Sequence, residues 1–148
     1  MSEDARTRVA ADIDAIEEAY EFCLAYAAQG ITKFDPASPI GNRMRRHLDK
    51  AAAALDDLIP ALGALLAAGD VEKAEEVEGF RALVEQDVKR AAGVLSLVRS
   101  RPTISSQLVD NLNASIHIRV LLTDLFLIDE VLKLGVDQAT EPKLEPAP

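Results

Sequence analysis

Residues 104 to 134 read ISSQLVDNLNASIHIRVLLTDLFLIDEVLKL, and this stretch decides the fold. Its second half carries apolar residues around more than half of a helical circumference, whereas a helix on a protein surface usually shows a narrower apolar stripe. These residues are Val120, Leu121, Leu125, Leu127, Ile128, Val131, Leu132 and Leu134. We therefore predict one long helix here, surrounded on nearly all sides by other helices or by a second molecule.

Three further amphipathic helices precede this one. In each, the spacing of apolar residues alternates between three and four, which is the repeat of a helical seam. The seams run from Val9 to Ala27, from Met44 to Leu65 and from Val77 to Val98. All four predicted helices therefore have one apolar face to bury.

Local signals mark the ends of these helices. Gly30 is typical of the position just after a helix. Ser38 followed by Pro39 is typical of an N-cap and a first helical residue, and Thr103 or Ser105 can cap the last helix. The connections on either side of the third helix are short.

The four helices have similar lengths, of about 27 to 31 residues or roughly 40 to 45 Å. Because short connections make neighbouring helices antiparallel, we predict an all-α, up-down-up-down four-helix bundle over residues 1–135. Residues 136–148 have no apolar periodicity and are rich in proline, which predicts a disordered tail. Whether the helices close within one chain or interleave between two chains is left open by the sequence.

Composition and charge exclude several classes of protein. A chain of 148 residues fits one domain, and its net charge of −9 argues against nucleic-acid binding or adsorption to an anionic membrane. The lone Cys23 cannot form an internal disulfide, the charged N-terminus does not resemble a secretory signal, and no apolar run is long enough to span a membrane. We therefore expect a cytoplasmic protein.

Motifs of enzymes and cofactor sites are missing from the sequence. Two histidines and one cysteine argue against a structural zinc site, and the Glu-x-x-His pairs of di-iron bundles are absent. Glycine-rich phosphate-binding loops and nucleophile motifs are absent as well. We expect no catalytic activity, no cofactor and no metal.

Basic residues gather at one end of the predicted bundle: Lys33, Arg43, Arg45, Arg46, His47, Lys50, Arg99 and Arg101. The arginines in the first turns of the second helix lie where the helix dipole repels a cation, so they require an anion. That anion is either an internal carboxylate, such as Asp35 or Glu21, or a bound ligand. Arg43 and Arg46 are therefore candidate ligand-binding residues.

A polar stripe on the last predicted helix is a second candidate site. On one continuous helix, several polar residues fall within about 60° of one another and inside the apolar arc: Ser106, Asp110, Asn113, His117 and Asp124. A carboxylate that faces a core is costly unless it is paired. The stripe therefore meets water where the bundle splays open, lines a ligand pocket, or lies in a subunit interface. Asp110, Asn113, His117 and Asp124 are the candidate ligand contacts.

The segment His47-Leu48-Asp49-Lys50 resembles, over these four residues, the His-x-x-Lys spacing of histidine phosphotransfer domains, which are also four-helix bundles. Those domains usually follow the lysine with glycine and an apolar turn, whereas Ala51 follows here and Arg45 and Arg46 lie beside the site. The resemblance implies a signalling role through His47.

The sequence favours a non-catalytic helical interaction or adaptor protein that forms a homodimer or binds another protein. The breadth of the apolar arc in the last helix supports a dimer. Phe22 and Tyr26 lie one turn apart, either under the following loop or against a second subunit. The alternatives are a bundle that binds a small anionic ligand through the basic end and the polar stripe, and a phosphotransfer-like protein that uses His47.

Overall fold

The computed structural model describes residues 2–32, 38–68 and 74–136, and every regular element in these ranges is a helix. The five helices are α1 (Ser2–Ala27), α2 (Pro39–Ala67), α3 (Ala74–Arg99), α4 (Ser106–Ala114) and α5 (His117–Leu132). The predicted all-α class is confirmed, but the described residues form five helices where four were predicted. Apart from Val136, the predicted tail lies outside the described residues, as do Lys33 and Asp35.

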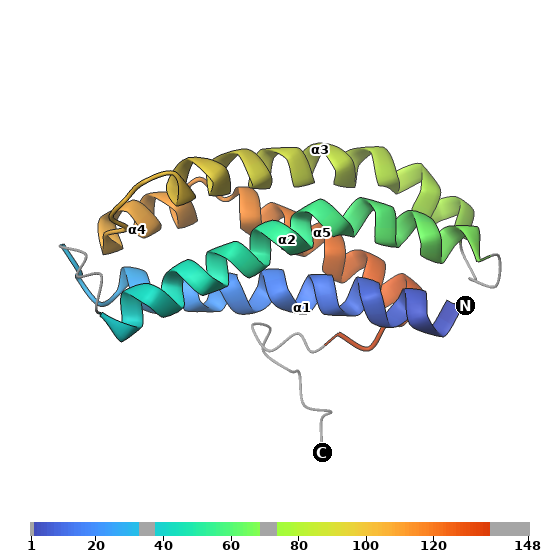
Figure 1. Cartoon of the computed structure of the whole chain (residues 1–148). Coiled ribbons are helices and arrows are strands. Elements are labelled where there is room, and N and C mark those ends of the chain that lie inside the picture. Colours follow the sequence, from blue (N-terminus) through green and yellow to red (C-terminus); the bar gives the residue numbers. More distant parts are fainter. Residues whose placement is uncertain (1, 33–37, 69–73, 137–148) are drawn as a thin grey trace, which may run out of the picture.

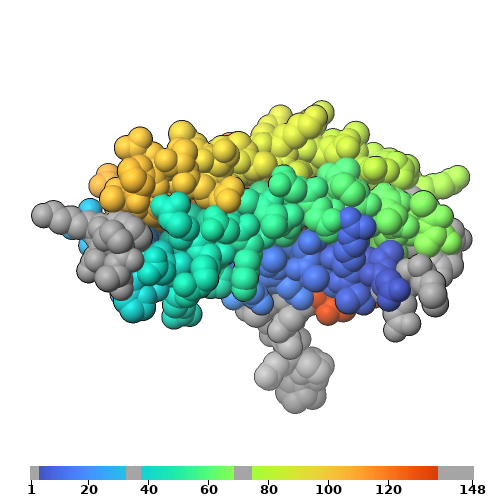
Figure 2. Space-filling model, viewed as in Figure 1, coloured from blue at the N-terminus to red at the C-terminus, as the bar shows by residue number. Residues whose placement is uncertain are grey.

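The three long helices lie lengthwise beside one another, and the two short ones complete the bundle. α4 and α5 follow one another along the remaining side, and both pack against α1 and α3 (Figure 1). On the opposite face, the side chains of α2 lie between those of α1 and α3 (Figure 2). The arrangement buries one continuous apolar core between the helices.

The single helix predicted over residues 104–134 is wrong, because the chain leaves the helical conformation at Ser115 and Ile116. The Ser115 hydroxyl donates a 2.6 Å hydrogen bond to the carbonyl of Leu112, a local bond that competes with helix propagation. Ile116 then takes φ 59° and ψ 0°, in the left-handed region. For a β-branched residue this conformation is strained, at a cost of about 1 to 3 kcal/mol.

Three predicted helix ends are confirmed. The Ser38 side chain accepts a 3.4 Å hydrogen bond from the Gly41 N–H at the start of α2. Ser105 does the same at the start of α4, where it accepts from the Leu108 N–H at 3.1 Å. Gly30 takes φ 67° just after α1, a value that glycine adopts without steric cost. These helix ends could be predicted from the sequence because each depends only on residues that are neighbours in the chain.

The core closes within one chain. Leu121, Leu125 and Ile128 of α5 are almost fully buried, and burial of each such side chain contributes about 1.5 to 3 kcal/mol. However, among the described helices α5 packs against α1, α3 and the adjoining α4, but not against α2. The other described helices therefore do not surround this segment by themselves, and the flank of α5 that carries Leu127 and Val131 remains exposed in the single chain.

Hydrogen bonds between distant parts of the chain join α1 to α4. The Tyr26 hydroxyl donates to the Ile104 carbonyl at 2.6 Å. The Ser106 hydroxyl donates to the Tyr26 carbonyl at 2.7 Å and accepts from the Ile31 N–H at 2.8 Å. These bonds hold the end of α1 against the start of α4.

At the other end of the molecule, α1 begins where α5 ends (Figure 1). Arg6 Nη1 donates a 2.7 Å hydrogen bond to the carbonyl of Leu132, the last residue of α5. Because the last carbonyls of a helix have no partner within it, this bond satisfies an acceptor that the fold would otherwise leave to water.

Candidate functional site

The residues predicted as ligand contacts lie at separate places in the structure. Arg43 and Arg46 are exposed on α2, where they line the same small cavity. The other four lie on α4 and α5: Asp110 is exposed, Asn113 and His117 are half-buried, and Asp124 is buried. Because the chain breaks at Ile116, the one continuous helical face on which these four residues were placed does not exist.

Asp110 and Asn113 lie against the end of α1. Asp110 borders an open cavity of about 560 Å³ together with residues at and just after that end: Ala27, Gly30, Ile31 and Thr32. Asn113 Nδ2 donates a 3.3 Å hydrogen bond to the carbonyl of Cys23, and its Oδ1 is buried without a hydrogen-bond partner. The hydrogen bond of Asn113 therefore serves the packing of α4 on α1.

Asp124 faces a second carboxyl group across the interface of α3 and α5. Burial raises the pKa of Asp124 to about 7, and the neighbouring carboxyl of Asp87 adds to this shift. Asp87 is itself buried and accepts a 3.1 Å hydrogen bond from Arg90 Nη1. The pair could not be found from the sequence, because it depends on the register between two helices far apart in the chain.

A similar pair of carboxyl groups lies between α1 and α2. Burial and the carboxyl of Asp57 raise the pKa of Asp12 to about 7, whereas the guanidinium of Arg8 lowers that of Asp57 to about 2. Arg8 Nε donates to both carboxylate oxygens of Asp57, at 3.1 and 2.9 Å. Over the described residues, no cluster of three His, Cys, Asp or Glu side chains is suited to a metal ion.

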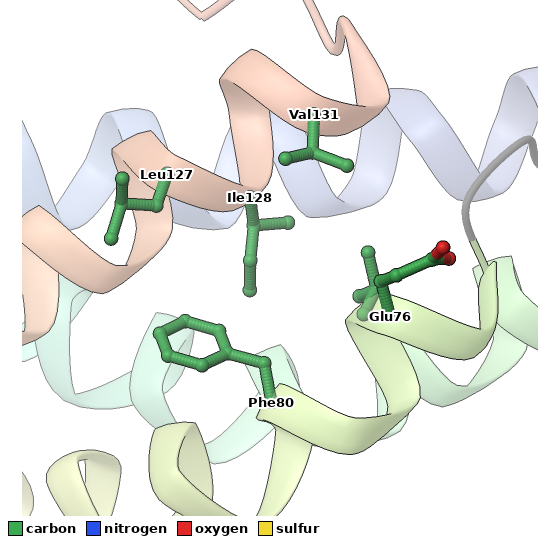
Figure 3. Close-up of a pocket in the computed structure, with 6 residues that line it drawn as sticks. Glu76, Phe80, Leu127, Ile128 and Val131 are labelled. Carbon is green, nitrogen blue, oxygen red and sulfur yellow. The ribbon is translucent and has the colours of Figure 1, made fainter.

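The exposed flanks of α3 and α5 form a surface that we call the α3–α5 apolar face: Phe80, Leu83, Val120, Leu127 and Val131. Leu127 is 55% exposed, Leu83 and Val131 are 46% exposed, and Val120 is 38% exposed. Within this face lies a groove of about 250 Å³, lined by Glu76 and Val77 as well as by apolar side chains of α5. Figure 3 shows Phe80 reaching from α3 toward Leu127 and Ile128.

A second surface, which we call the α2 basic cluster, consists of Arg43, Arg46, His47 and Lys50, and these side chains line a cavity of about 80 Å³. Phe22 of α1 lies beneath it. Its ring stacks on that of His47 with a centroid distance of 4.5 Å, and Arg43 Cζ lies 5.1 Å from its centroid. The aromatic ring therefore supports two members of the cluster.

Arg45 differs from its neighbours because it points toward α3. Its Nη1 donates to the Arg99 carbonyl at 3.2 Å and its Nη2 to the Arg101 carbonyl at 2.9 Å. Arg99 in turn pairs with Asp49, with Nη2 2.9 Å from Oδ1. The sequence predicts an anionic partner for this arginine, and carbonyl groups at the negative end of the α3 dipole fill that role.

The aromatic pair Phe22 and Tyr26 is used within the chain. Tyr26 is buried and bonded to Ile104, and the two rings stack with a centroid distance of 6.4 Å. Since Phe22 also stacks on His47, the pair packs within the monomer and does not present a free aromatic surface.

Comparisons with protein-family models, with curated proteins and with solved structures each gave no match. Over the described part of the chain, no helix combines the length and hydrophobicity needed to cross a bilayer.

Proposed function

We propose that this protein is a non-catalytic, cytoplasmic interaction protein that forms a homodimer through the α3–α5 apolar face. The observation that carries the proposal is the exposure of Leu127 and Val131 on α5, beside an apolar groove that these residues line together with Phe80 of α3. Contiguous apolar surface of this kind on a folded chain typically marks a binding site. We further propose that α4 and α5 together act as the fourth element of an up-down-up-down bundle.

The shape of the face favours a second copy of the chain as the partner. A two-fold symmetric interface uses the same surface on both subunits, so that surface must offer both a projection and a recess. Leu127 and Val131 project from α5, and the groove lies directly beside them. In a two-fold dimer, Leu127 of each copy enters the groove beside Phe80 of the other.

The dimensions of the face predict a dimer that dissociates readily. α5 has 16 residues, so the face is about 24 Å long, which is small for a permanent interface. Because Leu121, Leu125 and Ile128 are already buried within one chain, the monomer does not need a partner to fold. We therefore expect dissociation in the micromolar range.

Sedimentation equilibrium at roughly 10 to 100 µM tests this proposal. The wild-type chain should approach twice its 16.0 kDa mass as concentration rises. The double variant Leu127→Asp/Val131→Asp should remain monomeric, because each subunit would bring two carboxylates, and the dimer four in all, into an apolar contact. Circular dichroism should show unchanged helical content, since both side chains are about half exposed.

Leu24→Asp is the matched control, because Leu24 is 46% exposed on α1, away from this face. This variant should dimerise like the wild-type chain. A wild-type monomer at the highest concentration would contradict the proposal, and so would dimers of the double variant as stable as those of wild type. If Leu24→Asp alone abolished dimerisation, the interface would have to lie elsewhere.

A further inference from the structure

We propose that the α2 basic cluster binds a phosphate group, either as free phosphate or as the monoester of a small molecule. Arg43, Arg46, His47 and Lys50 border one cavity of about 80 Å³. A cavity of this size admits only a small group, so it suits a single tetrahedral anion whose substituent extends into solvent. The inference does not depend on dimerisation, which uses α3 and α5.

The four side chains converge because of their spacing on α2. Residues three and four apart are neighbours on a helix, and the pairs Arg43–His47 and Arg46–Lys50 are each four apart. Like charges at this spacing destabilise a helix unless an anion lies between them. Three permanent positive charges therefore lie on one short stretch of an otherwise acidic protein, where their mutual repulsion destabilises α2.

Most other arginines of the described residues already have a partner. Arg8 pairs with Asp57 and Arg99 with Asp49, while Arg6 and Arg45 bond to helix-terminal carbonyls. By contrast, none of Arg43, Arg46 and Lys50 lies within ion-pair distance of a carboxylate in the part of the chain that the structure describes. Among the described residues, no carboxylate therefore competes with an anion from solution for their donors by forming an ion pair.

Phe22 holds part of the cluster in place before any ligand binds. Its ring stacks on His47, and the guanidinium of Arg43 lies over it at a distance typical of a cation–π contact. Side chains that are already ordered lose less conformational freedom on binding, which favours affinity. The aromatic ring therefore orients the cluster and does not itself contact the ligand.

The number of donors favours phosphate over a carboxylate. One arginine satisfies a carboxylate through two parallel hydrogen bonds. Here two guanidinium groups, one ammonium and one imidazole surround the same cavity, which matches the charge and the several acceptor oxygens of a phosphate dianion.

His47 provides a direct readout of binding. Burial lowers its pKa, and the charges of Lys50, Arg43 and Arg46 lower it further, while Glu18 of α1 opposes them. A phosphate dianion in the cavity offsets the three cations, so the pKa of His47 should rise on binding. His117, the other histidine of the chain, lies on α5 and serves as an internal control.

The experiment is an NMR titration of the two histidine rings with inorganic phosphate and, separately, with phenyl phosphate, at constant ionic strength set with chloride. We expect a saturable change at His47, a rise in its pKa, and no change at His117. The variant Arg46→Ala/Lys50→Ala should bind about tenfold or more weakly, since it loses two charge-assisted contacts. The control Lys89→Ala/Arg119→Ala changes the net charge equally on exposed positions of α3 and α5, and should bind like wild type.

Both probes binding, or either one alone, supports the proposal and identifies the form of the phosphate. The absence of a saturable change with both probes would overturn it. Equal loss of binding in the control variant would also overturn it, because the effect would then reflect net charge alone. Arg43→Ala provides a second test of the site if the double variant loses helical content.

Discussion

Asp124 of α5 lies opposite Asp87 of α3 within the packed interface of these helices, and each residue exposes less than a tenth of its surface. Arg90 pairs with Asp87, but Oδ2 of Asp124 is buried without a hydrogen-bond partner. A buried carboxylate in this position costs free energy unless it holds a proton. The stability of the protein should therefore depend on pH through Asp124.

Replacement of Asp124 by Asn tests this dependence. The pKa of Asp124 is raised from 3.8 to about 7, so its favourable contribution is complete below about pH 4 and is lost as the pH rises through 7. Because Asn stays neutral, Asp124→Asn should increase the free energy of unfolding at pH 8 by about 1 to 3 kcal/mol and change it little at pH 4. Urea unfolding at both pH values measures this.

Asp110→Asn is the control for this prediction, since Asp110 is exposed. Its effect on the free energy of unfolding at pH 8 should be small, within about 0.5 kcal/mol. A lower stability of Asp124→Asn than of wild type at pH 8 would show instead that the charged pair stabilises the interface.

The adjacent residues Arg45 and Arg46 should differ sharply in their contribution to stability. Arg45 donates to two carbonyls at the end of α3, whereas Arg46 is exposed and has no ion pair among the described residues. Arg45→Ala should lower the free energy of unfolding by about 1 kcal/mol or more, and Arg46→Ala should change it by less than about 0.5 kcal/mol. Thermal unfolding of both variants provides the comparison, and equal effects would argue against a capping role for Arg45.

Relief of the strain at Ile116 should stabilise the fold. Glycine adopts a φ near 59° without steric cost, and the Ile116 side chain is 53% exposed, so little packing is lost. Ile116→Gly should therefore raise the free energy of unfolding by up to about 1 kcal/mol. Ala53→Gly, at an exposed position inside α2, should lower it by about the same amount. If both substitutions destabilise the protein equally in urea unfolding, Ile116 does not carry strain.

Most of the helical architecture could be predicted because its signals are local. The alternation of three and four identifies the seams of α1, α2 and α3, and Ser38, Gly30 and Ser105 mark three of the helix ends. The break between α4 and α5 could not be predicted in this way. Neither glycine nor proline lies near Ile116, and a single serine such as Ser115 is too weak a signal to mark a break inside a strongly apolar helical pattern.

The candidate sites were harder to predict from the sequence, because most of them join helices that are distant in the chain. Arg43 and Arg46 could be named as a pair, since their proximity follows from helical spacing alone. The stacking of Phe22 on His47 joins α1 to α2, and the contact of Asp87 with Asp124 joins α3 to α5. The excess of apolar residues in α5 predicts that part of this helix remains exposed. The sequence does not show which flank is exposed, because that depends on which helices pack against α5.

The bond between Arg6 and the carbonyl of Leu132 connects residues 126 positions apart in the sequence. Since the start of α1 lies beside the end of α5, a short linker joining them would allow circular permutation, with new ends opened between two other helices. In such a permutant the packing of α1 on α5 becomes local. The entropy lost in closing the longest loop of the present chain is then avoided, and the order in which helices associate during folding should change accordingly.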